Sequence, residues 1–96
     1  MEIIVAYDVS TEDSAGRRRL RRVAKVCEGC GQRVQFSVFE CRVNETELRR
    51  LTHRLVDEMD HELDSLRIYR LAEPRSRAVT VFGRDRYFDP DGPLIL

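Results

Sequence analysis

Asp8 and a cluster of arginines are the residues of this 96-residue chain whose types and spacing could support chemistry. Asp8 comes near the end of the apolar run "EIIVAYDV", and five arginines follow within "RRRLRR". A carboxylate at the end of a buried strand can bind a divalent metal, and guanidinium groups bind phosphate oxygens. Both features also have simpler interpretations, because an aspartate can cap the following turn and an arginine run can be a solvated surface.

The arginine cluster falls in the first turns of a predicted helix, which begins at Asp13 or Ser14 and runs to about Glu28. Cations are disfavoured at a helix N-terminus because the helix dipole is already positive there. In a chain of zero net charge, this local conflict favours an anion site. An apolar stripe follows the spacing i, i+3, i+4, i+7 through Leu20, Val23, Ala24 and Cys27. The cations opposite this stripe, expected to face solvent or a partner, are Arg18, Arg21, Arg22 and Lys25.

Most metal-dependent hydrolysis uses several carboxylates to hold the cation, and Asp8 alone supplies a single carboxylate. Glu12 and Asp13 lie across the predicted turn, and Glu40 is far along the chain. Neither a Ser/His/Asp triad nor a glycine-rich phosphate loop is evident in the sequence. The residues alone therefore leave Asp8 open between a turn cap and a ligand-binding position.

The cysteines raise the question of a metal or redox site. Cys27 and Cys30 have CxxC spacing, but a structural zinc site normally needs four ligands. Cys41, His53 and His61 are the other soft candidates, and they show no paired spacing. Because Cys27 also falls on the apolar face of the predicted helix, we interpret the cysteines as small buried apolar residues rather than zinc ligands.

The elements that must position these residues alternate between strand and helix. In chain order they are predicted as a strand over 3–9, a helix over 13–28, a strand region over 32–43, a helix over 44–60, a strand over 64–71 and a last short strand over 77–83. Asn44 with Glu47 resembles a capping box at the start of the second helix. This order predicts an α+β sandwich with two helices on one sheet face. Within 32–43, Val34, Phe36 and Val38 alternate with mostly polar residues, which predicts one apolar strand face. A ferredoxin-like βαββαβ pattern requires 32–43 to be shared between two short strands.

Composition is that of a single soluble domain. Apolar residues make up 42% of the chain, charged residues 35%, and the formal net charge is zero, which argues against a uniformly basic nucleic-acid binder but not against local patches. No apolar run is long enough for a membrane span and no signal peptide is evident, so we expect a cytoplasmic protein without membrane contacts. We expect a domain over 1–83 and a tail over 84–96.

Several segments in combination resemble the CRISPR-associated protein 2 family: "VAYDVS", the basic segment before "RVAKVCEGCGQRVQFSVFEC", and "DSLRIYRL". The resemblance covers residues 1–83 and extends to the ending "DPDGPLIL". It implies a ferredoxin-like core, a C-terminal strand that pairs onto the other protomer, and a homodimer in which Asp8 faces its mate across the two-fold axis. One carboxylate per chain then becomes two per site.

The family resemblance also implies roles for individual residues. Asp8 matches the catalytic metal ligand, for Mg²⁺ or alternatively Mn²⁺, and Tyr7 matches its aromatic neighbour. Phe36 departs from the family, because many relatives have tyrosine there. The arginines of the first helix match the family's basic patch, and the residues that match the segment around the site are Arg33, Ser37 and Phe39. In a nuclease of this family, Arg18, Arg22 and Arg33 are expected to bind the phosphates that flank the cleaved bond.

Two functions remain open, and they are compatible. One is a metal-dependent endonuclease acting on single-stranded RNA or duplex DNA. The other is a non-catalytic scaffold for CRISPR adaptation, which binds duplex DNA through its basic helices and bridges to the integrase subunit, with the apolar ending "PLIL" as a docking segment. A ferredoxin-like module that binds a small regulatory ligand ranks below both, because no ligand-pocket signature is evident.

Overall fold

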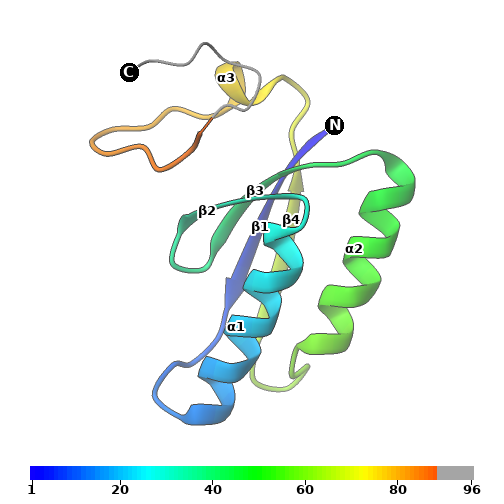
Figure 1. Cartoon of the computed structure of the whole chain (residues 1–96), viewed down its shortest axis with the longest axis vertical. Coiled ribbons are helices and arrows are strands. Elements are labelled where there is room, and N and C mark those ends of the chain that lie inside the picture. Colours follow the sequence, from blue (N-terminus) through cyan, green and yellow to red (C-terminus); the bar gives the residue numbers. More distant parts are fainter. Residues whose placement is uncertain (89–96) are drawn as a thin grey trace.

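A computed structural model describes residues 1–88 as a four-stranded antiparallel sheet with two helices on one face (Figure 1). The strands lie in the order β2-β3-β1-β4, so the first strand is central. The elements are β1 (Glu2–Asp8), α1 (Ser14–Glu28), β2 (Gly31–Gln35), β3 (Val38–Arg42), α2 (Glu45–Glu58), β4 (Ser65–Arg70) and a single turn, α3 (Arg75–Ala78). This order and topology confirm the predicted α+β class and ferredoxin-like βαββαβ pattern. Within residues 1–88, no helix is both long and apolar enough to cross a membrane.

The core lies between the sheet and the helices because β1 alternates strictly. Ile3, Val5 and Tyr7 point towards the helix layer and are buried. Each faces a core neighbour on β3 or β4, as Val5 does with Phe39. The predicted stripe of α1 is also buried, and Leu55 of α2 completes the layer. The alternate residues of β1, ending at Asp8, therefore face the other side of the sheet, which the helices leave open.

Both long helices begin at caps that the sequence predicts. The Asp13 carboxylate accepts a hydrogen bond of 2.7 Å from the backbone N–H of Gly16. Asn44 and Glu47 form the reciprocal capping box, with bonds of 2.8 and 2.9 Å. Gly16 is sterically required, because a Cβ there would overlap the carbonyl oxygen of Ser10. The caps thus fix where each helix starts, and with it the path of the loop that follows Asp8.

The first three predicted strand regions correspond to β1–β4 of the sheet. The position of Phe36 and the last predicted strand differ from the prediction. Region 32–43 is divided between β2 and β3, which are joined by a turn at Phe36 and Ser37. Phe36, predicted to lie on an apolar strand face, is 67% exposed because the turn interrupts the alternation. The strand predicted over 77–83 is wrong: α3 occupies its start, and no strand pairs with the remainder within residues 1–88. A strand needs a neighbouring edge, and here this segment has none.

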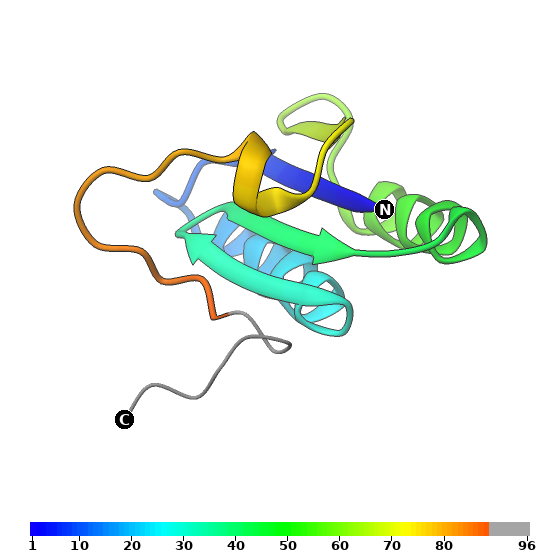
Figure 2. The same cartoon turned by 90° about the horizontal axis from the view of Figure 1, so that it is seen from above.

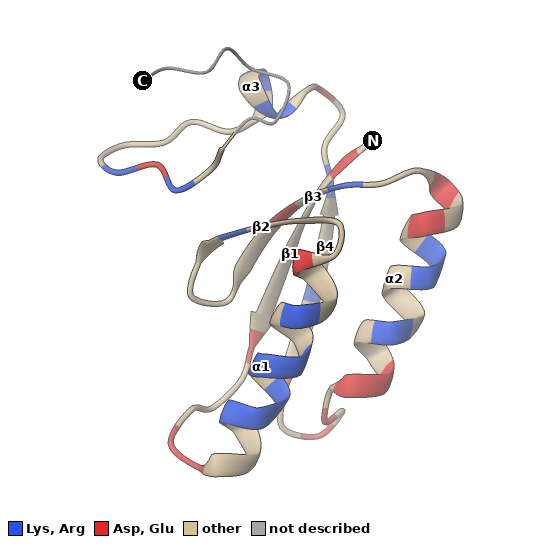
Figure 3. Cartoon of the chain, viewed as in Figure 1, with Lys and Arg blue, Asp and Glu red and all other residues tan. Residues whose placement is uncertain are grey.

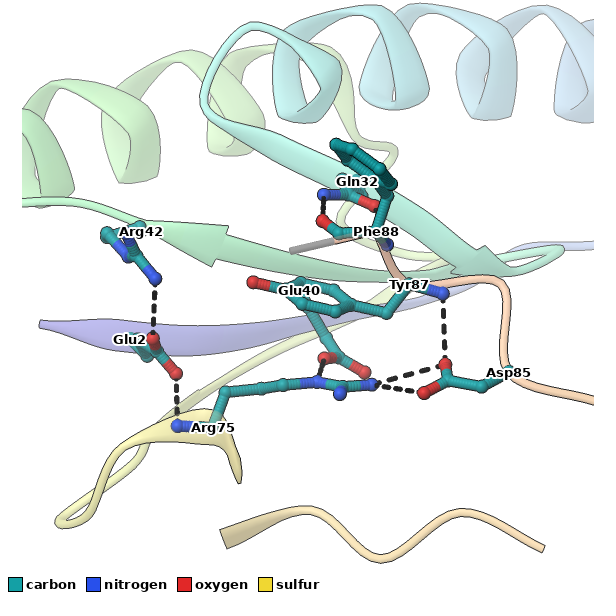
Figure 4. A network of polar contacts seen from close by, with 8 residues as sticks. All are labelled: Glu2, Gln32, Glu40, Arg42, Arg75, Asp85, Tyr87 and Phe88. Atoms are coloured by element: carbon teal, nitrogen blue, oxygen red, sulfur yellow. Dashed lines mark hydrogen bonds and ion pairs between the residues drawn. The ribbon is translucent and has the colours of Figure 1, made fainter. Parts of the chain in front are cut away.

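The described part of the tail contacts the open sheet face through the polar network that Figure 4 shows. This network includes Glu2, which lies at the opposite end of β1 from Asp8. Arg75 donates from Nε to Glu40 at 2.6 Å, reaches Asp85 at 3.2 Å and stacks 3.8 Å from the centroid of the Tyr87 ring. Figure 2 shows residues 79–88 looping away from the sheet and returning towards β2, where the Gln32 amide pairs with the backbone of Phe88. The predicted docking segment "PLIL" lies outside the described residues.

Candidate functional site

Asp8 lies in an open depression on the helix-free face of the sheet. It is the last residue of β1 and is exposed, and it pairs in register with Ser65 of β4. Its carboxylate forms no ion pair or hydrogen bond within the described part of the chain. Such a carboxylate is available to a ligand, whereas a turn cap would be occupied. The residues that line the depression are Ala6, Tyr7, Asp8, Ser37, Ser65 and Arg67.

Tyr7 borders Asp8 in sequence, but its ring lies on the opposite face of the sheet. The ring is buried, and its hydroxyl donates a hydrogen bond to Asp64. Burial raises the pKa of Tyr7 well above its usual value, and the hydrogen bond and charge of Asp64 raise it further. Tyr7 therefore stays neutral and fixes the end of β1 from behind, rather than facing a ligand beside Asp8.

Asp64 is the centre of a buried network that sequence reasoning missed. Its side chain is fully excluded from solvent and accepts from Arg19 at 2.8 and 3.1 Å and from the backbone of Asp60 at 2.9 Å. Burial alone would raise the pKa of Asp64, but the bonds from Arg19, Tyr7 and Asp60 outweigh it and hold the pKa below its usual range. One carboxylate thus joins β1, α1 and the loop before β4. The only signal in the sequence is an aspartate placed directly before a strand.

Most of the cations of α1 are exposed, as predicted, but they lie on a different face of the molecule from Asp8. Arg19 turns inwards to Asp64, whereas the outward-facing cations sit on the helix layer, on the other side of the sheet from the Asp8 carboxylate (Figure 3). α2 adds a second basic surface on this layer. The exposed cations are Arg17, Arg18, Arg21, Arg22 and Lys25 on α1, and Arg49, Arg50 and Arg54 on α2.

The remaining predicted site residues belong to the β2–β3 hairpin and play different parts. Arg33 donates to the carbonyl of Phe36 at 2.8 Å, and its guanidinium lies 5.2 Å from the Phe36 ring and 5.6 Å from the Phe39 ring. Phe39 is fully buried. Ser37 alone reaches the depression, and its carbonyl accepts from the backbone of Tyr7 at 3.0 Å. Arg33 and Phe39 thus shape the hairpin that presents Ser37 to Asp8.

The donor set around Asp8 fits a hard cation only in part. A carboxylate and two serine hydroxyls are oxygen ligands of the kind that Mg²⁺ prefers. Within residues 1–88, however, no group of three or more His, Cys, Asp or Glu side chains is placed to hold a metal. One chain therefore supplies one acidic ligand, and a second carboxylate would have to come from another molecule.

The cysteines occupy a separate position behind β3. Cys27 is buried on the apolar face of α1, as predicted, and Cys41 is buried beside it. The thiols of Cys30 and Cys41 both approach the carbonyl oxygen of Cys27, at 3.4 and 3.7 Å. The neighbouring Cys41 thiol raises the pKa of Cys30, and burial raises it further. The thiols of Cys30 and Cys41 are therefore protonated at neutral pH.

Comparisons with a family model, with named proteins and with solved structures all point to the same family and cover most or all of the chain. The sequence model of the family described as CRISPR associated protein Cas2 matches residues 1–79. A protein of Moorella thermoacetica named CRISPR-associated endoribonuclease Cas2 1 is 53% identical over the full length of both chains. One of Halalkalibacterium halodurans named CRISPR-associated endonuclease Cas2 is 46% identical over 99% of each. The crystal structure of Streptococcus pyogenes Cas2 superposes with a TM-score of 0.82 and 49% identity, covering 86% of this chain and all of that one.

Proposed function

This chain belongs to the CRISPR-associated Cas2 family, and we propose that it is a metal-dependent nuclease of CRISPR adaptation that cleaves phosphodiester bonds at Asp8. The observation that carries this proposal is the exposed Asp8 carboxylate, which is unpaired within residues 1–88 and lies in a depression lined by hydroxyl groups and an arginine. The names of the relatives agree on a nuclease: one is called an endoribonuclease, and another is called an endonuclease without a stated substrate.

The second carboxylate of the site comes from a second copy of this chain. The sheet face that carries Asp8 is covered by neither α1 nor α2, and it bears the partly exposed apolar residues Ile4, Ala6, Val38 and Tyr69. Covering them in a symmetric homodimer removes apolar surface from water. A two-fold axis near Asp8 brings one carboxylate from each protomer to the same site.

The protein groups at this site have separable tasks. Asp8 of each protomer holds the divalent cation, Mg²⁺ or Mn²⁺, and the hydroxyls of Ser37 and Ser65 supply further oxygen contacts. When bound, the cation supplies charge neutralisation at the phosphate and a bound water of lowered pKa. Tyr7 keeps the strand end in place through Asp64, so Asp8 does not need to reorganise when substrate arrives.

A second function, as a duplex-binding scaffold, is favoured by the basic helix layer. α1 and α2, with their exposed arginines, lie on the sheet face opposite to the one that carries Asp8, so a dimer formed through the Asp8 face leaves both basic surfaces free. These surfaces bind the phosphate backbone of duplex DNA without reading bases. The tail, ending in "PLIL", docks onto the integrase subunit. Scaffolding and cleavage then use different surfaces of the same dimer.

The nuclease proposal is tested with Asp8→Asn, which keeps the shape of the side chain and removes its charge. Glu12→Gln is the matched control, because Glu12 is an exposed acid across the turn from Asp8. We expect Asp8→Asn to abolish metal-dependent cleavage of single-stranded RNA and duplex DNA, while the control cleaves like the wild type. Equal cleavage by wild type and Asp8→Asn at matched purity would show that the activity comes from elsewhere.

The scaffold is tested separately on the helix layer. The double variant Arg18→Ala/Arg22→Ala is expected to bind duplex DNA more weakly with a shallower salt dependence, and Arg18→Lys/Arg22→Lys to restore most of the affinity. Unchanged affinity of the alanine variant at physiological salt would refute backbone binding by α1. Full assembly with the integrase after deletion of residues 93–96 would refute docking by the tail.

A further inference from the structure

Arg67 is a cation at the Asp8 depression that the proposed function leaves without a task. It lies on β4, two residues from Ser65, and pairs in register with Ala6 of β1. Because Ser65 pairs with Asp8, Arg67 and Asp8 are diagonal neighbours on the same sheet face. Such neighbours have Cα atoms about 7–8 Å apart, within reach of a long side chain.

The two opposite charges do not pair with one another. Within residues 1–88, Arg67 forms no ion pair with a carboxylate, and its guanidinium instead donates to the Tyr69 hydroxyl at 3.1 Å, further along the same strand. Arg67 still lines the depression together with Asp8. The space between the two side chains is therefore bordered by an acid and by a cation. It suits a ligand with a negatively charged group, which Arg67 can bind, next to a metal ion, which Asp8 can bind.

The other polar side chains of the depression strengthen this assignment. Ser37 of the hairpin and Ser65 of β4 carry hydroxyls that can donate. Among residues 1–88, Asp8 is the single acidic side chain that lines the depression. Guanidinium and hydroxyl donors are the groups that most often contact phosphate oxygens in nucleic-acid complexes. The exposed cations of α1 cannot serve here, because they lie on the far side of the sheet.

We propose that Arg67 is the phosphate-contacting residue of the Asp8 site, binding the phosphodiester whose cleavage Asp8 supports. The inference rests on the proposed nuclease function and assigns its substrate contact to the sheet face rather than to the basic helices. The Tyr69 hydroxyl holds the guanidinium along the strand until the phosphate takes its place or shares it. The alternative role for Arg67 is a contact with the partner protomer, which would be seen in the stability of the dimer.

Binding is measured in an Asp8→Asn background, where cleavage is prevented and the acidic wall is neutral. Fluorescence anisotropy with single-stranded RNA and duplex DNA oligonucleotides measures the binding affinity over a salt series. The proteins compared are Asp8→Asn alone and Asp8→Asn combined with Arg67→Ala or Arg67→Lys. Arg70→Ala is the matched control, because Arg70 is an exposed arginine of the same strand that pairs with Glu45 on the other face. Sedimentation of each variant reports the dimer.

We expect Arg67→Ala to weaken binding of the tighter-bound oligonucleotide about tenfold, the usual size of one charge-assisted hydrogen bond to phosphate. The slope of log affinity against log salt should become shallower by about 0.7 to 0.9, the change for one phosphate no longer neutralised. Arg67→Lys should recover part of the affinity, and Arg70→Ala should match the Asp8→Asn protein. With Asp8 restored, Arg67→Ala should raise KM more than it lowers kcat.

Three outcomes of the comparison between variants would overturn the inference. They are equal affinity of Arg67 and Arg67→Ala proteins, an equal loss in Arg70→Ala, and dissociation of the Arg67→Ala dimer with unchanged affinity per dimer. The failure of the nuclease proposal looks different, because there Asp8→Asn cleaves like the wild type whatever stands at residue 67. Absence of binding to both oligonucleotides by the Asp8→Asn protein would also refute the phosphate contact.

Discussion

Replacing Asp64 by alanine is expected to destabilise the fold more than any surface substitution, although Asp64 lies outside the candidate site. Its carboxylate is fully shielded from solvent and accepts hydrogen bonds from Tyr7, Arg19 and the backbone of Asp60. Within residues 1–88, no buried side-chain polar atom lacks a hydrogen-bond partner. Alanine at this position would leave the donors of three residues, Tyr7, Arg19 and Asp60, without the acceptor around which they are arranged.

The loss in the free energy of unfolding depends on whether those donors can reach water or another acceptor instead. The Tyr7 hydroxyl is deeply buried, so losing its acceptor costs about 1–3 kcal/mol. The Arg19 side chain is 17% exposed and can turn partly to water, which keeps the loss below the 3–5 kcal/mol typical of a broken buried ion pair. We therefore expect Asp64→Ala to lower the free energy of unfolding by about 3 kcal/mol.

Urea unfolding at fixed protein concentration measures this loss, with Tyr7→Phe and Asp57→Ala as comparisons. Tyr7→Phe keeps the ring and removes one hydrogen bond, so it should lower the free energy of unfolding by about 1 kcal/mol. Asp57 is exposed, so Asp57→Ala should leave the free energy of unfolding almost unchanged. The pKa of Asp64 is lowered on folding, so its contribution is present above about pH 4 and lost as pH falls through the folded pKa. A loss below 1 kcal/mol at neutral pH would refute the reasoning.

Three further predictions concern elements that frame the site. Gly16→Ala should cost about 2 kcal/mol or more in urea unfolding, because a methyl group would overlap the Ser10 carbonyl; Ala15→Gly in the same turn is the comparison. Asn44→Ala should lower the melting temperature by the equivalent of about 1 kcal/mol through loss of the capping box, and Asn44→Ser should retain most of it. Stability should fall as pH rises above about 10, because the unfolded state releases the Tyr7 proton before the folded state does, and Tyr7→Phe should show less of this fall.

Local patterns in the sequence predict most of the fold because they are physically local. The stripe of α1 and the reciprocal cap of Asn44 and Glu47 depend on residues three or four apart, and both are found as expected. The strand over 77–83 was wrong because strand formation depends on a distant partner edge. Phe36 was misplaced because alternation alone does not reveal where a continuous run turns back on itself.

The candidate site was only partly predictable, since its members come from two strands, β1 and β4, and from the β2–β3 turn. Asp8 stood out as a carboxylate at the end of an apolar run, and the structure places it in a depression. Ser65 and Arg67 had no signal, because their approach to Asp8 follows from the pairing of β1 with β4 rather than from spacing. Arg19 was grouped with the basic surface, and only the position of Asp64 shows that it faces inwards.

The shielded cysteines make selective labelling of this protein feasible. Cys27 and Cys41 are shielded from solvent, the pKa of Cys41 is raised to about 12 and that of Cys30 is raised as well, so all three should react slowly with maleimides at neutral pH. A cysteine introduced at exposed Ser65 would react far faster. Two spin labels placed this way, one per protomer, would report in solution how closely the two Asp8 carboxylates approach each other.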